Sequence, residues 1–141
     1  MTTTIRKAMA YITRGQELLI FRQPLFPEAG LQVPGGTIHE GEDPQAAALR
    51  EAVEKTGLTN LKVMRFLGEQ VREMTEAGRG EIHHRYFYQL TTNEPRSEWE
   101  WHDEEITTQL FFVKLTAVPE LSTEQDYLLR KHESSTADPD E

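Results

Sequence analysis

The stretch that decides the fold runs from Gly36 to Leu58 and reads GTIHEGEDPQAAALREAVEKTGL. Asp43 can cap a helix, Pro44 suits the first helical position, and Gly57 can end the helix in a left-handed conformation. Between them, Gln45–Thr56 contains four alanines and no further glycine or proline. The pattern therefore predicts a helix that follows a glycine-rich segment.

One face of this helix carries charge. A helix turns by about 100° per residue, so Glu51, Glu54 and Lys55 share a face. Leu49 and Val53 point to the other side, where we expect them to pack on a sheet. Taken alone, the Glu-x-x-Glu spacing is typical of a solvated helix surface.

The glycines before the helix suggest a more specific role for these carboxylates. A Gly35-Gly36 loop lets the backbone approach a ligand closely, and Glu51 and Glu54 beside it can hold a hard cation such as Mg²⁺. Such a cation bridges phosphate oxygens, neutralises charge on a leaving group and activates water. The local pattern therefore favours phosphate chemistry if the two features lie together.

The spacing of the whole stretch resembles the signature of the Nudix hydrolase family. That signature is Gly, five residues, Glu, seven residues, Arg-Glu, an aliphatic, any residue, Glu-Glu, any residue, Gly and an aliphatic. The chain matches it at seven positions, which are Gly36, Glu42, Arg50, Glu51, Glu54, Gly57 and Leu58. The resemblance implies an α+β fold, the family's α/β/α sandwich with a mixed β-sheet. It also implies a pyrophosphohydrolase that uses Mg²⁺, with Mn²⁺ as a substitute, to cleave a phosphoanhydride bond in a nucleoside diphosphate linked to another moiety.

The same resemblance implies roles for individual residues. Glu51 and Glu54 would bind the metal and take part in catalysis, and Arg50 would hold the carboxylates in place. Glu42 would lie close by as a supporting carboxylate of the metal site. The Gly35-Gly36 segment would offer backbone oxygen to the metal and would help to bind the substrate.

Two positions depart from the family pattern. Ala52 replaces a larger aliphatic residue, which affects packing more than chemistry. Lys55 replaces the second glutamate of the Glu-Glu pair, where the family commonly has a direct metal ligand. A cation there repels a metal ion by roughly 4 kcal/mol per unit-charge pair at close range and an effective dielectric of 20, although Lys55 can pair with Glu51. The alternative function is therefore a nucleotide-binding or regulatory module that keeps the fold and has impaired catalysis.

The composition limits the partners. A net charge of -9, from 24 acidic and 15 basic residues, argues against general nucleic-acid binding but does not exclude small phosphorylated ligands. The family resemblance implies a small nucleoside diphosphate derivative as the partner. The chain has no cysteine, no signal-like apolar segment after Met1 and no apolar run long enough to span a membrane. These features predict a cytoplasmic protein that does not bind membranes, and they leave open whether it forms a homodimer.

The length of 141 residues suits one domain, which we expect over residues 1–133, followed by a disordered acidic tail over residues 134–141. The β-forming runs and turn signals predict further elements. These are a hairpin of Ala8–Thr13 and Leu18–Phe21, strands over Ile82–Leu90 and Leu110–Leu115, and a closing helix over Ser122–His132. Residues 24–30, 76–80 and 91–101 are expected to be the variable loops that set specificity.

Several other side chains have two interpretations. The consecutive His83 and His84 point to opposite faces of a strand, so they cannot chelate one metal together. If extended, Trp99 and Trp101 share a face, where they either stack on a base or pack within the protein. The acidic run could supply a remote catalytic carboxylate, and its members are Glu98, Glu100, Asp103, Glu104 and Glu105.

Overall fold

The computed structural model describes residues 2–76, 79–104 and 106–130. The expected acidic tail, the end of the predicted closing helix and the tip of the turn near Gly78 lie outside these residues. The strands are β1 (Thr2–Arg14), β2 (Glu17–Arg22), β3 (Gly35–Thr37), β4 (Lys62–Glu76), β5 (Arg79–Thr91), β6 (Glu98–Asp103) and β7 (Ile106–Lys114). The helices are α1 (Pro44–Thr56) and the 3-10 turns η1 (Pro27–Ala29), η2 (Leu115–Ala117) and η3 (Ser122–Glu124).

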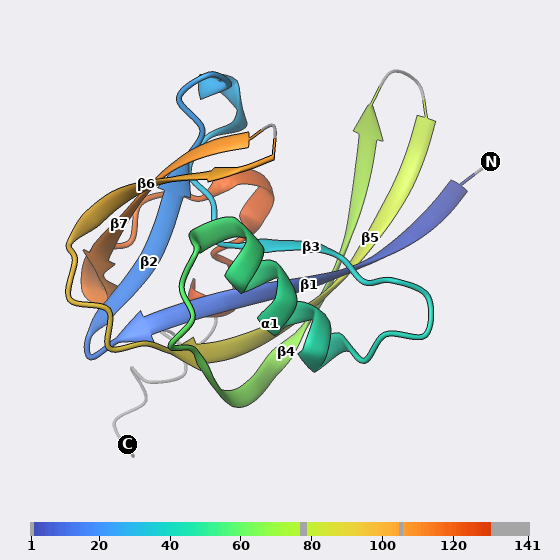
Figure 1. Cartoon of the computed structure of the whole chain (residues 1–141). Coiled ribbons are helices and arrows are strands. Elements are labelled where there is room, and N and C mark those ends of the chain that lie inside the picture. Colours follow the sequence, from blue (N-terminus) through green and yellow to red (C-terminus); the bar gives the residue numbers. More distant parts are fainter. Residues whose placement is uncertain (1, 77–78, 105, 131–141) are drawn as a thin grey trace, which may run out of the picture.

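The strands form one mixed seven-stranded sheet with the order β4-β5-β1-β2-β7-β6, and β3 pairs with β1 off this path (Figure 1). β1 runs parallel to β5 along nearly its whole length and antiparallel to both β2 and β3. The predicted hairpin of β1 and β2 is confirmed, but both strands pair mainly with other elements. The expected α+β fold with a mixed sheet is likewise confirmed.

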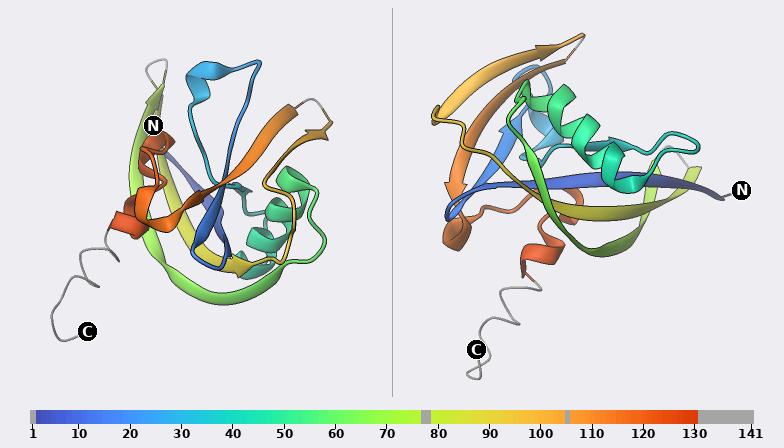
Figure 2. Two further views of the ribbon diagram at one scale, coloured as in Figure 1. Left: turned by 90° about the vertical axis from the view of Figure 1, so that its left-hand side faces the viewer. Right: turned by 60° about the horizontal axis from the view of Figure 1, so that its bottom comes forward.

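Alternation along β1 places its side chains in two hydrophobic cores. Ala8, Ala10 and Ile12 lie in the core under α1, whereas Met9 and Tyr11 lie in a second core on the opposite face. This separation follows from the period of two along a strand. In Figure 2, left panel, α1 and the C-terminal segment lie on opposite sides of these strands. The arrangement is a three-layer sandwich whose second outer layer is built mostly of short turns.

Helix α1 has the predicted boundaries, because Asp43 accepts a hydrogen bond from the Ala46 N–H and Gly57 ends the helix with φ 77°. Its packing differs from the prediction. Val53 is 37% exposed, while Ala47, Ala48 and Ala52 are buried with Glu51. Alanine side chains allow the helix to lie close to the small residues of β1, which explains why the alanine side faces the sheet.

The segment after β7 does not form the predicted helix from Ser122. Ser122–Glu124 is a 3-10 turn, and Thr123 and Glu124 have positive φ values of 48° and 59°. Left-handed residues cannot continue a right-handed helix, so within the described part of the chain helical structure resumes at Tyr127 and is seen as far as Arg130. Arg85 donates hydrogen bonds to the carbonyl and hydroxyl of Thr123, and these tertiary contacts help to define a conformation that local sequence patterns could not reveal.

The predicted loops are partly regular. Pro27–Ala29 is a 3-10 turn, strands β4 and β5 extend to Glu76 and Arg79, and residues 98–101 belong to β6. The predicted Gly35-Gly36 loop is the strand β3, which pairs with Ala8 and Met9 of β1. Within the described residues, no helix is long and apolar enough to cross a membrane.

Candidate functional site

Arg50 stands at the centre of three carboxylates. Its guanidinium donates two hydrogen bonds to Glu42, from Nε to Oε2 at 2.8 Å and from Nη2 to Oε1 at 2.9 Å. Nη1 lies 2.8 Å from Glu51 Oε2 and 3.4 Å from Glu54 Oε2, and Nη2 also donates to the Thr37 carbonyl. We call Arg50 with Glu42, Glu51 and Glu54 the Arg50 cluster. The residues that the sequence pattern selected are therefore brought together, and one arginine joins α1 to the segment before it.

Glu42 is fully engaged within this cluster. Its two oxygens accept the bidentate pair from Arg50, and Oε1 also accepts the His39 N–H at 3.0 Å. The hydrogen bonds from Arg50, and then that from the His39 backbone, lower the pKa of Glu42 to about 2. In this arrangement Glu42 supports Arg50, since three of the roughly four acceptor positions of its carboxylate take part in these hydrogen bonds.

Glu51 lies against the backbone of β3. Its side chain is buried, and a Cβ atom added at Gly36 would come within 2.3 Å of the Glu51 carboxylate carbon. Only glycine leaves room for a carboxylate this close to the strand. The glycine of the motif therefore has a steric purpose here, because it allows Glu51 to reach the backbone that we expected to offer oxygen to a metal.

Lys55 lies on the same side of the helix as Glu51. Its Nζ atom is 4.0 Å from Glu51 Oε1, so the expected helical ion pair is present at long range. Lys7 of β1 donates a hydrogen bond from Nζ to Thr37 Oγ1 at 3.1 Å. Burial holds the pKa of Lys7 below its ordinary range, Lys55 and Arg85 act in the same direction, and Glu51 and Glu81 oppose them. Positive charge from Lys7, Lys55 and Arg85 thus gathers near Gly36.

The donors present suit a weakly held hard cation. Among the described residues, no group of three or more carboxylate or histidine side chains is arranged to enclose a metal. Mg²⁺ commonly keeps several waters and binds through one or two carboxylates plus substrate phosphates. Glu51 and Glu54 meet that requirement, with the Glu54 side chain 45% exposed to solvent. The chemistry of the donor set therefore fits Mg²⁺ that is held partly by the protein and partly by a phosphate.

A cavity of about 300 Å³ lies beside the Arg50 cluster. It is lined by residues of β1, β3, β5, α1 and the turn η3, including Lys7, Gly36, Lys55, His83, Arg85 and Gln125. We call this cavity the basic pocket. Two of its lining residues, Gly36 and Lys55, lie against Glu51 of the Arg50 cluster, so a ligand could contact both at once.

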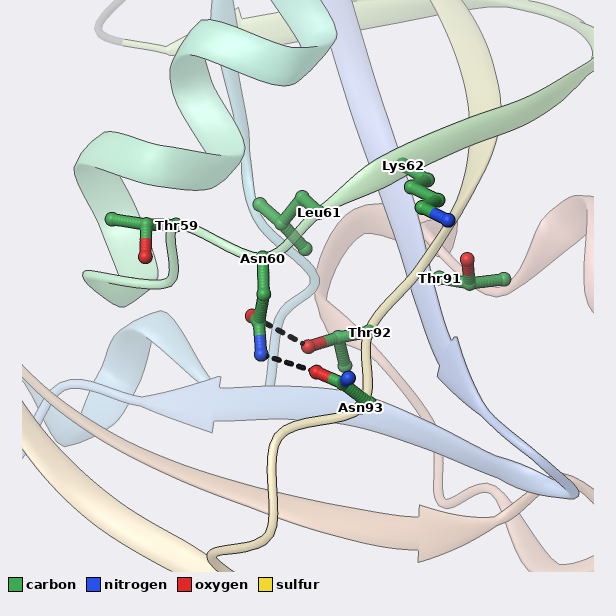
Figure 3. A pocket seen from close by; sticks show the side chains of 7 residues that line it. All are labelled: Thr59, Asn60, Leu61, Lys62, Thr91, Thr92 and Asn93. Carbon is green, nitrogen blue, oxygen red and sulfur yellow. Dashed lines mark hydrogen bonds between the residues drawn. The ribbon is translucent and has the colours of Figure 1, made fainter.

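A second cavity, of about 430 Å³, lies beyond the C-terminal end of α1 (Figure 3). It is lined by residues 59–62 and 91–93, and Asn60 ties its two walls together through hydrogen bonds with Thr92 and Asn93. It shares no lining residue with the basic pocket and contains no carboxylate. Its polar side chains connect two segments of the chain by hydrogen bonds, and this set of residues offers no carboxylate for phosphate chemistry.

The two tryptophans support α1. Trp99 Nε1 donates to the Thr56 carbonyl at 2.9 Å, and Trp101 Nε1 donates to the Glu54 carbonyl at 2.8 Å. The Trp101 ring also fills the space where Gly57 lacks a side chain. Of the two interpretations, packing within the protein is therefore the one observed, since both rings satisfy carbonyls at the helix end.

The two histidines point to opposite faces, as expected. His83 lines the basic pocket and contacts Glu81, whereas His84 stacks on Tyr86 and contacts Glu69. The remote carboxylate stays unassigned. Among the described residues of the acidic run, none is hydrogen-bonded to Arg50, and Glu105 lies outside the described residues.

Lys7 and Arg85 are the site residues that the sequence did not indicate. They are partners in the parallel register of β1 and β5, where their side chains lie on the same face. Their separation along the chain carries no local signal, because parallel strand pairing depends on the whole sheet. Only the register of two distant strands reveals that they flank the motif.

Comparisons with known proteins agree with the fold and with the motif. The sequence profile of the NUDIX domain matches residues 3–132. The chain is 33% identical over 87 residues to human diphosphoinositol polyphosphate phosphohydrolase 3-beta, an alignment that covers 62% of this chain and 49% of that protein. The chain spans about half the length of the curated relatives that it matches.

Two solved structures share the fold at low sequence identity. A UDP-X diphosphatase superposes with a TM-score of 0.69 at 20% identity, covering 95% of this chain and 64% of that one. An Ap4A hydrolase of C. elegans in a binary complex superposes with a TM-score of 0.64 at 20% identity, covering 94% and 98% of the two chains. Because the profile covers nearly all of the described residues, the chain belongs to the NUDIX family.

Proposed function

We propose that the protein is a Mg²⁺-dependent pyrophosphohydrolase that cleaves a phosphoanhydride bond in a nucleoside diphosphate linked to another moiety. The observation that carries this proposal is the Arg50 cluster, which holds Glu51 and Glu54 together beside Gly36 and the opening of the basic pocket. Family membership supports phosphoanhydride hydrolysis in general, and the metal and substrate class are the finer parts of the proposal.

Each residue of the cluster has a distinct task. Glu51 and Glu54 hold the cation, with Mn²⁺ as a substitute, and the cation supplies charge neutralisation at the phosphate oxygens when it is bound. Arg50 keeps the carboxylates from moving apart, and Glu42 orients Arg50. Gly36 allows Glu51 to lie against β3 and leaves the backbone there accessible to the substrate.

The reaction consumes one water. We assign Glu54 to accept a proton from that water, because it is the most exposed carboxylate of the cluster. The water oxygen forms a bond to one phosphorus, the bond from that phosphorus to the bridging oxygen breaks, and the bridging oxygen leaves with the second phosphate. Arg50 stays protonated throughout, since its hydrogen bonds to Glu42 and Glu51 raise its pKa above the ordinary range.

The names of the similar proteins support a substrate with linked phosphates. They describe a diphosphoinositol polyphosphate phosphohydrolase, a UDP-X diphosphatase and an Ap4A hydrolase. Two of these three names refer to nucleotides with a further group attached, which is the class that we propose for this chain.

The second candidate is a nucleotide-binding or regulatory module without turnover. The specific observation in its favour is Lys55, whose ammonium lies 4.0 Å from a carboxylate oxygen of Glu51. A positive group at this distance opposes a cation at the same oxygen. Both candidates bind phosphorylated ligands, so binding alone does not distinguish them.

The deciding experiment is a substrate panel of nucleoside diphosphate derivatives and nucleoside triphosphates, each incubated with Mg²⁺, with Mn²⁺ or with EDTA. We expect metal-dependent release of nucleoside monophosphate from at least one diphosphate derivative. Ligand-induced thermal stabilisation without turnover in every condition would instead support the binding module. Absence of both turnover and stabilisation would refute both candidates.

A further inference from the structure

The basic pocket has an unusual charge for this protein. The chain has a net charge of -9, yet the lining of the pocket includes Lys7, Lys55 and Arg85 with His83. None of the described lining residues is an aspartate or a glutamate. Lys55 contacts Glu51 and His83 contacts Glu81, but Lys7 and Arg85 form no ion pair among the described residues. Cations in excess of their acidic partners in a concave site attract a ligand of opposite charge.

Arg85 is the most informative of these cations because it is only 4% exposed. Among the described residues its hydrogen bonds are to neutral groups, namely Gln70 Oε1 at 2.9 Å, the Thr123 carbonyl at 2.6 Å and Thr123 Oγ1 at 2.7 Å. A guanidinium carries five N–H donors and is costly to bury without a compensating anion. The nearby Glu124 forms its ion pair with Arg72, and its charge only partly offsets the burial that lowers the pKa of Arg85.

Lys7 and Lys55 approach the same space from different elements. Lys7 is the register partner of Arg85 across β1 and β5, and Lys55 extends from the last turn of α1. Among the described residues, the Lys7 ammonium donates only to Thr37 Oγ1, although an ammonium has three donors. Donors of both lysines therefore remain available to a ligand, and repulsion between the like charges falls when an anion binds.

We propose that the basic pocket binds the phosphate groups of the moiety linked to the nucleoside diphosphate, and that it does so without a metal ion. Lys7, Lys55 and Arg85 supply the positive charge, and Lys55 connects this pocket to the Arg50 cluster through Glu51. The inference rests on the proposed function only in treating the bound anion as part of the substrate. It assigns the linked moiety to a phosphate-bearing class.

The lining favours phosphate over a nucleobase. Among its described lining residues, the one phenylalanine, tyrosine or tryptophan ring is that of Phe21, which is 3% exposed and packs in the core under α1. A base needs an accessible flat surface on which to stack, whereas phosphate oxygens need charged donors. The half-buried ammonium groups of Lys7 and Lys55 meet the second requirement.

The test uses inorganic tripolyphosphate as the probe, with EDTA present throughout. Binding to the full chain is followed by calorimetry and thermal shift at low and at physiological salt. We expect tripolyphosphate to bind and to raise the melting temperature, with affinity that weakens as salt increases. Adenosine, which carries no phosphate, is expected to give no shift in melting temperature.

Matched variants locate the binding. K7Q and K55Q are each expected to weaken tripolyphosphate binding at least tenfold. K62Q is the control, since it removes the same charge from the wall of the cavity in Figure 3. Arg85 is left unchanged in this test because its burial links it to folding.

The outcomes separate this inference from the proposed function. Metal-dependent hydrolysis without tripolyphosphate binding in EDTA would overturn the inference alone. Tripolyphosphate binding that K7Q and K55Q weaken would support it even if no substrate in the panel is hydrolysed. Equal weakening by K62Q, or stabilisation by adenosine and not by tripolyphosphate, would overturn it.

Discussion

The Arg50 cluster and the basic pocket, which meet near Gly36, differ in charge and in how they are built. On one side, Arg50 joins Glu42, Glu51 and Glu54, all from a single short stretch of chain. On the other side, the basic pocket takes its cations from α1, β1 and β5, which are distant in sequence. Among the described charged residues, only Lys55 belongs both to the motif and to the basic pocket. The motif therefore specifies the carboxylates, whereas the pairing of β1 with β5 brings together the cations that a ligand would meet beside them.

The largest effect that we expect comes from the acidic side. E54Q removes the exposed carboxylate that we assign to the metal and to the attacking water, so turnover should fall by about 100-fold or more. The Glu54 side chain is 45% exposed, and its contact with Arg50 is long at 3.4 Å. The free energy of unfolding should therefore change by less than about 0.5 kcal/mol. Steady-state kinetics and thermal unfolding measure the two quantities.

The matched control for this prediction is E120Q, which neutralises an exposed glutamate between η2 and η3. It should retain wild-type turnover. An E54Q protein with wild-type turnover and an intact fold would show that the metal site is elsewhere.

The next effect concerns the residue that holds the acidic side together. R50A leaves three carboxylates without their shared donor, so it should lower the free energy of unfolding by about 2 kcal/mol. It should also weaken Mg²⁺ binding, because the carboxylates no longer keep their positions. Chemical denaturation and Mg²⁺ titration test this prediction.

R50K is the companion variant, because it keeps the charge and loses the bidentate geometry. Its stability should lie between those of wild type and R50A. Equal melting temperatures and equal metal titrations for wild type and R50A would rule out this role.

These carboxylates could be predicted from the sequence because their contacts are local. Asp43 and Gly57 define the ends of α1, and helical spacing then places Glu51 near Glu54 and Lys55. Burial along the helix was predicted less well, since Val53 is exposed and Glu51 is buried. The larger apolar side chain of Val53 suggested that its face would pack on the sheet, but the face with the small alanines lies closest to the sheet.

The basic pocket could not be predicted in the same way. Lys7 and Arg85 become neighbours only through the register of two parallel strands. The turn that covers Arg85 was predicted to be helical, and its left-handed Thr123 is held by contacts with Arg85 itself. Features that depend on long-range pairing leave no periodic signal in the local sequence.

A smaller effect is expected in acid. The pKa of Glu42 is lowered from 4.5 to about 2 in the folded protein, so its ionised form favours folding above the higher value. That contribution should be lost progressively as the pH falls from about 4.5 towards 2. Unfolding curves at pH 6, 4 and 3 should therefore show that the difference in free energy of unfolding between wild type and E42Q becomes smaller as the pH decreases. A constant difference between the two proteins across this range would contradict the assignment.

Lys55 tests the relation between the Arg50 cluster and the basic pocket most directly. It is the motif position at which this chain carries a positive charge where the family pattern has a glutamate. The measurement is a Mg²⁺ titration of wild type, K55Q and K55E by calorimetry without substrate. K55Q separates removal of the cation from addition of a new oxygen ligand. We expect affinity to increase from wild type to K55Q and again to K55E, by at least tenfold overall, because the cation near Glu51 is first removed and then replaced by a ligand. Equal Mg²⁺ affinity in all three proteins would contradict the account, since it would show that Lys55 does not limit the metal site.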